Sequence, residues 1–276
     1  MPYPYSPAVK LVCLDIDGTV LNSKNQITPK VKDAIQKTAG LGIPVVLVSA
    51  RMPKGVRDIQ QKLEITAPLI CYGGAMVLLE DGSVLYSQTI PLNTAKETAV
   101  LCRQFGVHLS LYQEDCWYAP IDQYSKKEWE IVGFGPDASP DLTDLWTNFE
   151  QRQTGPHKLM AIGSVDQISA LQQALSLRGI LSVLSKPTYL EILPPNTTKT
   201  NAIIQLEKEM QISSDQVLAM GDSWNDLDMI THAGIGIAMG NSPLEVRSQA
   251  TLVAPTNDHD GVGIMLEQII LSSFAL

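Results

Sequence analysis

Short apolar runs rich in β-branched residues alternate with segments of helical periodicity at both ends of this chain. Near the beginning, the apolar run Val9–Ile16 precedes a helical pattern that starts at Thr28 and stops at Gly40, and a second β-branched run follows over residues 44–48. Another helical pattern leads to a third short run at 69–72. Strands that alternate with helices in this way predict a parallel sheet with right-handed crossovers. The expected fold class is α/β.

The far end of the chain repeats this alternation. The expected elements are helices over residues 198–210, 225–233 and from Gly261 onward, with short strands at 216–220, 235–239 and 251–254.

Between residues 84 and 190 the pattern changes to separate strand-like pieces. These lie at 107–112, 116–119, 158–162 and 182–184, with a helical stretch at 165–177 and a polar loop at 133–141. The length of 276 residues is ample for two units with separate cores. We therefore expect an α/β core domain formed by residues 1–83 and 191–276, interrupted by an inserted α+β domain over 84–190.

The overall charge argues against a nucleic-acid partner. The formal net charge is -9 at pH 7, whereas broad nucleic-acid binding needs clustered Lys and Arg. No apolar run reaches the length of about 18 residues that a membrane-spanning helix requires. A phosphorylated small molecule is compatible with the acidic composition, because one local cation or bound metal can outweigh distant carboxylates. We expect such a small molecule as the partner, with neither nucleic acid nor membrane.

The cysteines and the first residues favour the cytoplasm. Cys13, Cys71, Cys102 and Cys116 are far apart and form no C-x-x-C pair, which argues against zinc and favours small buried side chains over disulfides. The opening segment MPYPYSPAVK lacks the charged-then-apolar pattern of a secretion signal.

Two aspartates stand at the end of the first expected strand, in the segment DIDGT. Asp15 and Asp17 are two residues apart, so in an extended chain both carboxylates can face one site. That site would lie at the carboxyl edge of the sheet, where open α/β sheets bind ligands. Gly18 lets the backbone turn sharply towards a ligand or metal, with Thr19 in support. The alternative is a polar turn that only ends a strand.

Three further polar features stand at element boundaries. Ser49 directly follows the second strand in VSAR and could bind a phosphate, and Lys199 opens a helix. Asp222, Asn225 and Asp226 follow another strand in GDSWND, and their oxygens suit a hard cation such as Mg²⁺. Each has an ordinary alternative: a helix N-terminal residue, a solvated lysine and an Asx-rich helix cap. Each feature alone is ambiguous, but the occurrence of all four in this order, each at the end of a strand or helix, is a specific signal.

The order DIDGT, VSAR, Lys199, GDSWND resembles the four motifs of the haloacid dehalogenase superfamily of phosphatases. The long insertion between Ser49 and Lys199 is similar to that of the Cof-type (type IIB) subfamily, which places an α/β cap there. The resemblance implies a Rossmann-like core with a parallel sheet, a cap that selects the substrate, and Mg²⁺ as cofactor. It covers essentially the whole chain.

By this resemblance, Asp15 is the nucleophile that forms an aspartyl phosphate, and Asp17 is the general acid and then base. Asp222 binds Mg²⁺ together with the Asp15 carboxylate and the Asp17 main-chain carbonyl. Ser49, Lys199 and Asn225 bind the phosphoryl group, and Asp226 supports the metal and Lys199.

The chemistry makes these roles coherent. An anionic nucleophile needs a cation before it can approach an anionic phosphate. Asp17 can protonate the leaving group only if its pKa is raised, which burial under a closed cap would favour.

Some positions depart from the subfamily pattern. Members commonly have Asn-Gly-Ala after the third strand, whereas this chain has Gly73 in place of the asparagine. That leaves one hydrogen bond unaccounted for. Asn257, in a late polar loop, either approaches the site or belongs to a plain turn.

Other functions stay open at this point. A sugar phosphomutase shares the cap type, and a non-catalytic metal- or ligand-binding protein could keep the fold, although such a protein would be expected to lose Asp15 or Asp17. The identity of the phosphate ester and the oligomeric state are also open.

Overall fold

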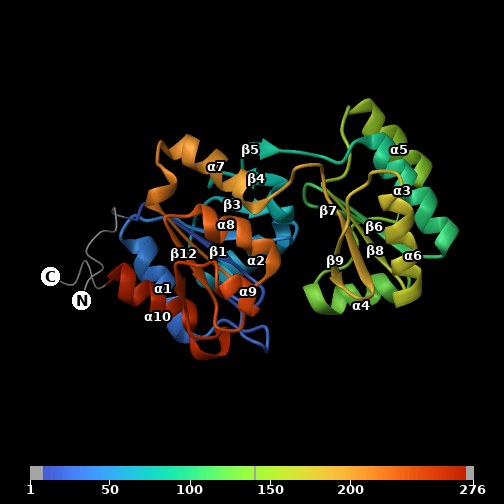
Figure 1. The fold of residues 1–276 in the computed structure, drawn as a ribbon. Helices are drawn as coiled ribbons and strands as arrows, with labels where there is room; N and C mark the ends of the chain where they lie inside the picture. The colour runs from blue at the N-terminus through green and yellow to red at the C-terminus, as the bar shows by residue number, and fades with distance from the viewer. Residues whose placement is uncertain (1–8, 140, 272–276) are drawn as a thin grey trace. The chain divides into compact units, whose positions relative to one another are not determined.

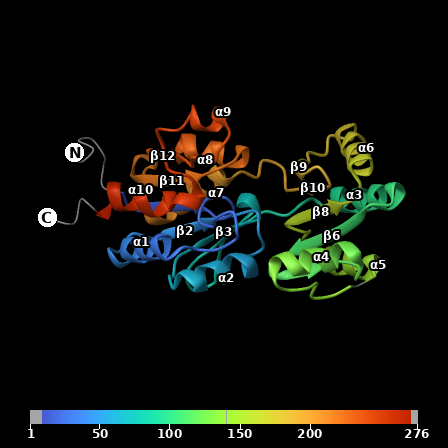
Figure 2. The same ribbon diagram turned by 90° about the horizontal axis from the view of Figure 1, so that it is seen from below.

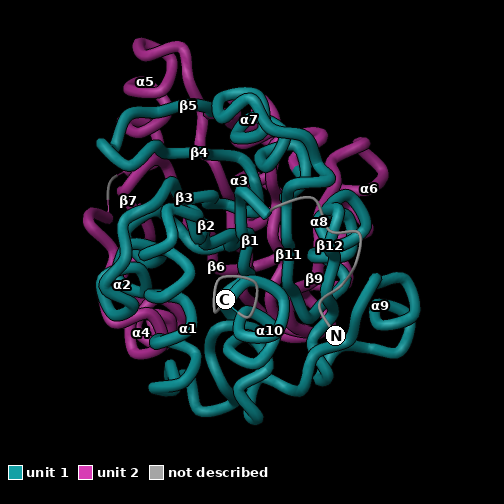
Figure 3. Tube along the Cα trace, turned by 90° about the vertical axis from the view of Figure 1, so that its left-hand side faces the viewer, with its two compact units in different colours: residues 1–86, 198–276 teal, residues 87–197 magenta. Residues whose placement is uncertain are grey.

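The computed structural model describes residues 9–139 and 141–271, which divide into two compact units (Figure 3). Unit 1 comprises the residues up to 86 and from 198 onward, and unit 2 comprises residues 87–197. Each unit has its own sheet and its own hydrophobic core.

The sheet of unit 1 has eight strands in the order β13-β12-β11-β1-β2-β3-β4-β5. In chain order they are β1 (Leu11–Asp15), β2 (Val45–Val48), β3 (Leu69–Cys71), β4 (Met76–Leu78), β5 (Val84–Ser87), β11 (Val217–Gly221), β12 (Ile235–Ala238) and β13 (Leu252–Val253). The pairs from β13 through to β3 are parallel, and β4 turns back antiparallel to β3. All residues of β1 and β2 are buried, which explains why their sequences are continuous apolar runs and do not alternate.

Helices cover both faces of this sheet (Figure 1). They are α1 (Pro29–Gly40), α2 (Pro53–Leu63), α7 (Lys199–Met210), α8 (Leu227–His232), α9 (Leu244–Arg247) and α10 (Gly261–Ile269). Helices α1 and α10 lie side by side, and α7 packs on α8. The start of α1 follows from its sequence, because the Thr28 side chain accepts a hydrogen bond from the Val31 N–H and Pro29 occupies the first turn.

Unit 2 is built on a five-stranded sheet in the order β7-β6-β8-β10-β9 (Figure 2). Its strands are antiparallel and comprise β6 (His108–Gln113), β7 (Cys116–Tyr118), β8 (Lys158–Ile162), β9 (Val183–Lys186) and β10 (Tyr189–Ile192). Its helices are α3 (Leu92–Phe105), α4 (Gln123–Val132), α5 (Leu142–Gln151) and α6 (Val165–Ser176). Apolar residues of α3, α5 and α6 pack against one face of the strands and form the core of this unit.

The α/β fold class with a second, antiparallel sheet is confirmed, but the sequence patterns missed several elements of unit 2. Helices α3, α4 and α5 and strand β10 were not expected. Helix α4 exposes Trp129 and Ile131 and buries Ser125 and Glu128, so its apolar residues do not mark its buried face. What starts it is a capping box, in which the Asp122 side chain accepts from the Ser125 N–H and the Ser125 side chain accepts from the Asp122 N–H.

In unit 1, the helix expected over 225–233 divides into a 3₁₀ turn at Trp224–Asp226 followed by α8. All four cysteines are unpaired, and Cys13, Cys71 and Cys102 are buried. Within the described residues, no helix has the length and apolar character needed to traverse a bilayer. Residues 1–8, which make up most of the segment examined for a secretion signal, lie outside the described part of the chain.

Candidate active site

Three polar residues meet at the carboxyl edge of the unit 1 sheet. Strand β1 lies between β11 and β2 and is parallel to both, so the three strands end at the same edge. Asp15 is the last residue of β1 and pairs with Val48. Asp222 follows the end of β11, and Ser49 follows the end of β2. The edge that the sequence predicted as a binding site is therefore lined by residues from all three strand ends.

Lys199 brings a positive charge to this edge from the first turn of α7. The Thr198 side chain caps this helix by accepting from the Asn201 N–H. The Lys199 ammonium is buried and donates to Asp15 Oδ1 at 2.7 Å and to Asp226 Oδ1 at 2.5 Å. A lysine that the sequence alone left ambiguous between surface and site thus lies between two carboxylates in the interior.

Asp226 organises the turn after β11. Its side chain is fully buried, and its Oδ2 accepts hydrogen bonds from the backbone N–H groups of Asp222 and Ser223 at 3.0 and 2.9 Å. Its Oδ1 receives the Lys199 ammonium. Because both oxygens have donors, the contacts of Asp226 fit a residue that holds the turn and the lysine in place.

The cluster carries an excess of negative charge. Oxygens of Asp15, Asp222 and Asp226 all lie within 4.8 Å of one another, and the Lys199 ammonium pairs with two of these three carboxylates, those of Asp15 and Asp226. When all are ionised, two negative charges are left unbalanced in a largely buried place. Such an arrangement is unfavourable unless the carboxylates hold protons or a cation is bound.

The pKa values of the cluster reflect this imbalance. Burial, with the charge of Asp226 next, raises the pKa of Asp15 to about 8, although Lys199 acts in the opposite direction. Burial and the charges of Asp226 and Asp17 raise the pKa of Asp222 to about 6. Burial alone would lower the pKa of Lys199, but the charges of Asp15 and Asp226 outweigh it and raise that pKa.

These groups fit a divalent cation. Two charges are missing, the available ligands are carboxylate oxygens, and hard cations such as Mg²⁺ prefer oxygen ligands. Among the residues that the structure describes, none donates a hydrogen bond to Asp15 Oδ2, and the side chain of Asp222 accepts only one long bond, of 3.3 Å, through Oδ2. Asp15 and Asp222 therefore have oxygens to offer, whereas both oxygens of Asp226 already accept hydrogen bonds.

Asp17 occupies a different environment from the one the sequence suggested. Its side chain is 54% exposed and pairs with Arg51, whose Nε and Nη2 donate to its two oxygens at 2.9 and 2.6 Å. The carboxylates of Asp15 and Asp17, expected to face one site, thus have different partners. The cause is local, since Gly18 turns the chain immediately after Asp17 and Arg51 lies just beyond β2. The predicted role of Asp17 as general acid requires burial under a closed cap, so that role stays a prediction.

Ser49 and Thr19 are buried, whereas Asn225 is exposed. The Ser49 hydroxyl accepts from the Arg51 N–H at 3.2 Å. The Thr19 hydroxyl has no hydrogen-bond partner among the described residues. The Asn225 side chain accepts from the Ser223 hydroxyl, and within the described residues no hydrogen bond joins it to Asp15 or Lys199.

Gly18 and Gly74 allow close approaches that a side chain would prevent. Gly18 has φ +85°, and a Cβ there would lie 2.4 Å from Asp222 Oδ2. Gly74 has φ +106°, and a Cβ would lie 2.1 Å from the carbonyl oxygen of Thr198, next to Lys199. Gly73 has φ +65°, which asparagine also tolerates, so its backbone conformation suits either residue.

The sequence motifs did not assign roles to two residues that contact the site. Arg51 was only part of a motif, yet it holds Asp17. Asn241 was not singled out, yet its amide donates to Gly18 O at 2.9 Å and to Asp222 Oδ2 at 3.3 Å. A signal existed for Asn241, because it lies just after β12, at the same carboxyl edge as the other strand ends.

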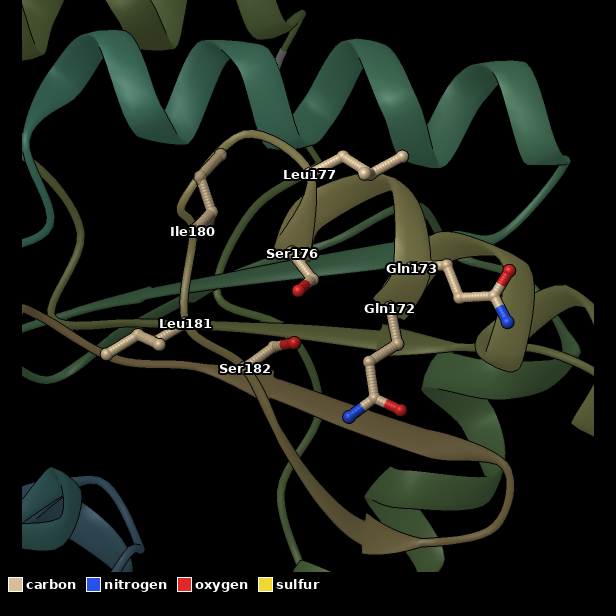
Figure 4. Close-up of a pocket in the computed structure, with 7 residues that line it drawn as sticks. All are labelled: Gln172, Gln173, Ser176, Leu177, Ile180, Leu181 and Ser182. Atoms are coloured by element: carbon tan, nitrogen blue, oxygen red, sulfur yellow. The ribbon is translucent and has the colours of Figure 1, made fainter.

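A separate hollow lies in unit 2, between the end of α6 and the segment leading into β9 (Figure 4). Its volume is about 530 Å³, and it is lined by Gln172, Gln173, Ser176, Leu177, Ile180, Leu181 and Ser182. None of the candidate site residues lines this hollow, and none of its lining side chains is charged. The acidic edge of unit 1 is therefore the better candidate for a catalytic site.

Known proteins share both sequence and fold with this chain. A model of the family described as haloacid dehalogenase-like hydrolase matches residues 12–266. A provisionally named phosphatase of Haemophilus influenzae is 31% identical over 94% of this chain and 97% of its own length. A Bacillus subtilis protein named 5-amino-6-(5-phospho-D-ribitylamino)uracil phosphatase is 27% identical over 97% of this chain and 100% of its own length. The crystal structure of a haloacid dehalogenase-like hydrolase from Bacteroides thetaiotaomicron has a TM-score of 0.85 at 26% identity and covers 94% of this chain and 98% of its own.

Proposed function

This chain belongs to the haloacid dehalogenase-like hydrolase family, as its motifs predicted, and we propose that it is a Mg²⁺-dependent phosphatase of small phosphate monoesters. The observation that carries the proposal is the cluster of Asp15, Asp222, Asp226 and Lys199, which lacks two positive charges. A divalent cation supplies those charges, and the anionic ester needs the same cation in order to approach Asp15.

In this proposal the cation is held by the carboxylates of Asp15 and Asp222 and by the main-chain carbonyl of Asp17. When bound, Mg²⁺ neutralises charge between nucleophile and phosphoryl group and orients the two. Asp226 holds the turn and Lys199, in agreement with the full use of its oxygens.

Asp15 is the proposed nucleophile, and the product of the first step is an aspartyl phosphate on its side chain. Asp15 attacks phosphorus, the ester P–O bond breaks, and the leaving alkoxide takes a proton from Asp17. Asp17 then accepts a proton from the water that hydrolyses the acyl phosphate. Lys199 stabilises the charge on the phosphoryl oxygens and keeps Asp15 oriented through its 2.7 Å contact.

Asp17 must leave Arg51 before it can act in this way. In the structure both of its oxygens accept from the guanidinium, so neither is free to meet a leaving group. An arginine fork also suits a phosphate, and an incoming substrate anion would compete with Asp17 for Arg51.

Ser49 and Asn225 complete the proposed phosphate site, and unit 2 is the proposed cap that selects the ester. The partner is a small phosphorylated metabolite. The relative from Bacillus subtilis that is named for a phosphorylated ribitylamino-uracil supports this class of substrate. The unpaired cysteines support a cytoplasmic location.

The test is phosphate release from a panel of sugar phosphates, nucleotides and cofactor phosphates, measured with Mg²⁺ and with a chelator. We expect turnover of at least one ester with Mg²⁺ and none with chelator. Mass spectrometry of acid-quenched enzyme should locate phosphate on the peptide that contains Asp15. Turnover that survives chelation, or phosphate on another residue, would contradict the proposal.

A further inference from the structure

Asn241 connects the acidic edge to a loop that the motifs do not include. Its side-chain Nδ2 donates both to the carbonyl of Gly18 and to Asp222 Oδ2. Its Oδ1 accepts the backbone N–H of Asn257 at 3.1 Å. This third contact fixes the orientation of the amide, because the oxygen must face the Asn257 N–H and the nitrogen must then face the two acceptors.

The backbone around Asn241 is held in position by close packing. The Gly240 N–H donates to the carbonyl of Pro255 at 3.3 Å, and a Cβ on Gly240 would lie 2.9 Å from the carbonyl oxygen of Ala254. The Ser242 N–H closes a turn onto the carbonyl of Met239 at 3.0 Å. The amide of Asn241 therefore projects from a fixed turn.

Asn257 extends this linkage to the loop after β1. Its Nδ2 donates to the carbonyl of Leu21 at 2.9 Å. Together the two asparagines hold the Gly18 carbonyl and the Asp222 carboxylate at the acidic cluster and the Leu21 carbonyl in the loop after β1. The main chain of Asp17 precedes Gly18 directly, so the held turn is the one that presents its carbonyl.

We propose that Asn241 is a positioning residue that orients Asp222 and the turn at Asp17–Gly18 for a divalent cation, and that Asn257 acts through it. An amide suits this task because its neutral N–H₂ satisfies a carboxylate and a carbonyl at once. A carboxylate at position 241 would add repulsion to a cluster that already has two negative charges in excess. This inference rests on the proposed function in that the cation is the one the phosphatase would use.

The experiment measures Mg²⁺ affinity of the full chain by isothermal titration calorimetry without substrate. Outer residues that orient metal ligands affect affinity by about 10–100-fold, and we expect a loss in this range for Asn241→Ala. Asn257→Ala should lose less, because it removes only the contact to Leu21 and keeps the backbone N–H that binds Asn241 Oδ1. The double variant should lose no more than Asn241→Ala alone, because the two residues act in series. Asn93→Ala is the matched control, since it removes an exposed amide from α3 in unit 2.

The melting temperature in chelator shows whether each variant is folded before metal is added. A folded Asn241→Ala protein that binds Mg²⁺ as tightly as the wild type overturns the inference and leaves the proposed function intact. If Asn241→Ala does not fold, Asn241→Leu decides, because it keeps the branched shape of the side chain but has no amide donor, and an unchanged Mg²⁺ affinity in that variant overturns the inference. Absence of Mg²⁺ binding in the wild type overturns both the inference and the proposed function.

Discussion

At the scale of single residues, the site contains buried carboxylates whose mutual repulsion is unfavourable for the folded protein. Asp15 is buried beside other carboxylates, and its pKa is raised mainly by burial and next by Asp226. Burial beside like charges therefore disfavours the ionised form of Asp15. The ionised carboxylate is the form that the proposed nucleophile needs, but it is also the form that destabilises the folded protein.

Replacing Asp15 allows its effects on activity and on stability to be measured separately. Asp15→Asn keeps the size of the side chain but removes the nucleophile, and turnover should fall by more than about 10³-fold. In chelator the variant should melt higher than the wild type at pH 8, because the unfavourable charge is gone, and a gain of about 1 kcal/mol corresponds to about 2–4 °C. Scanning calorimetry measures the shift, and Asp58→Asn, at an exposed residue paired with Lys62, is the control that should leave turnover unchanged. Substantial turnover by the Asp15→Asn variant would show that Asp15 is not the nucleophile.

Asp17 is tested through the leaving group. Asp17→Asn should slow hydrolysis of alkyl phosphates by about 10²–10⁴-fold, the usual contribution of a general acid or base. Formation of the phosphoenzyme from p-nitrophenyl phosphate should suffer much less, since nitrophenolate leaves without a proton. Pre-steady-state bursts with the two substrates give the comparison. An equal loss for both, or no loss with alkyl esters, is inconsistent with the proposed role.

At the scale of elements, the loop after β3 and the start of α7 determine where Lys199 lies. Tyr72, Gly73 and Gly74 all have positive φ, so the chain bends sharply there. The absence of a side chain on Gly74 lets this loop approach the backbone of Thr198, which caps α7. The position of Lys199 thus depends on a glycine that is distant from it in the sequence.

Gly74→Ala tests this dependence, with Gly42→Ala as the matched control. Both glycines have positive φ, so each substitution should destabilise by about 1–3 kcal/mol from backbone strain. Gly42 faces open space, whereas a Cβ at Gly74 meets the Thr198 carbonyl, which should add about 1–3 kcal/mol from overpacking. Urea unfolding gives the energies, and turnover should fall only for Gly74→Ala. Equal losses in the two variants would show that the close approach is unimportant.

At the scale of the whole molecule, the raised pKa values make stability depend on pH and metal together. Between pH 4 and about 6 the raised pKa values of Asp15 and Asp222 keep protons on both residues that the unfolded chain has released, and from about pH 6 to 8 Asp15 alone keeps its proton. Because the unfolded state then binds fewer protons, the free energy of unfolding falls as pH rises through this range.

Mg²⁺ should weaken this dependence of stability on pH. Melting temperatures measured in chelator should decline from pH 5 to pH 8 more steeply than those in saturating Mg²⁺, because the bound cation stabilises the ionised carboxylates. Mg²⁺ affinity should rise over the same range as the competing protons leave. Parallel pH profiles with and without Mg²⁺ would contradict the assignment of the cation to this cluster.

The sequence by itself determined the α/β class, the family and the order of the strands and helices that carry the motifs. It could do so because buried parallel strands are short apolar runs, and because polar residues placed directly after such strands meet at one edge. The same rule pointed to Asp15, Ser49 and Asp222, and applied to β12 it would have pointed to Asn241.

Only the tertiary structure decided which of these groups contact one another. The burial of Lys199 between two carboxylates, the pairing of Asp17 with Arg51 and the link from Asn241 to Asn257 join residues far apart in the chain. Such contacts depend on strand order and on backbone approaches at Gly18 and Gly74, and local sequence patterns carry no information about them. The same holds for α4, whose capping box starts the helix while its exposed apolar residues conceal its buried face.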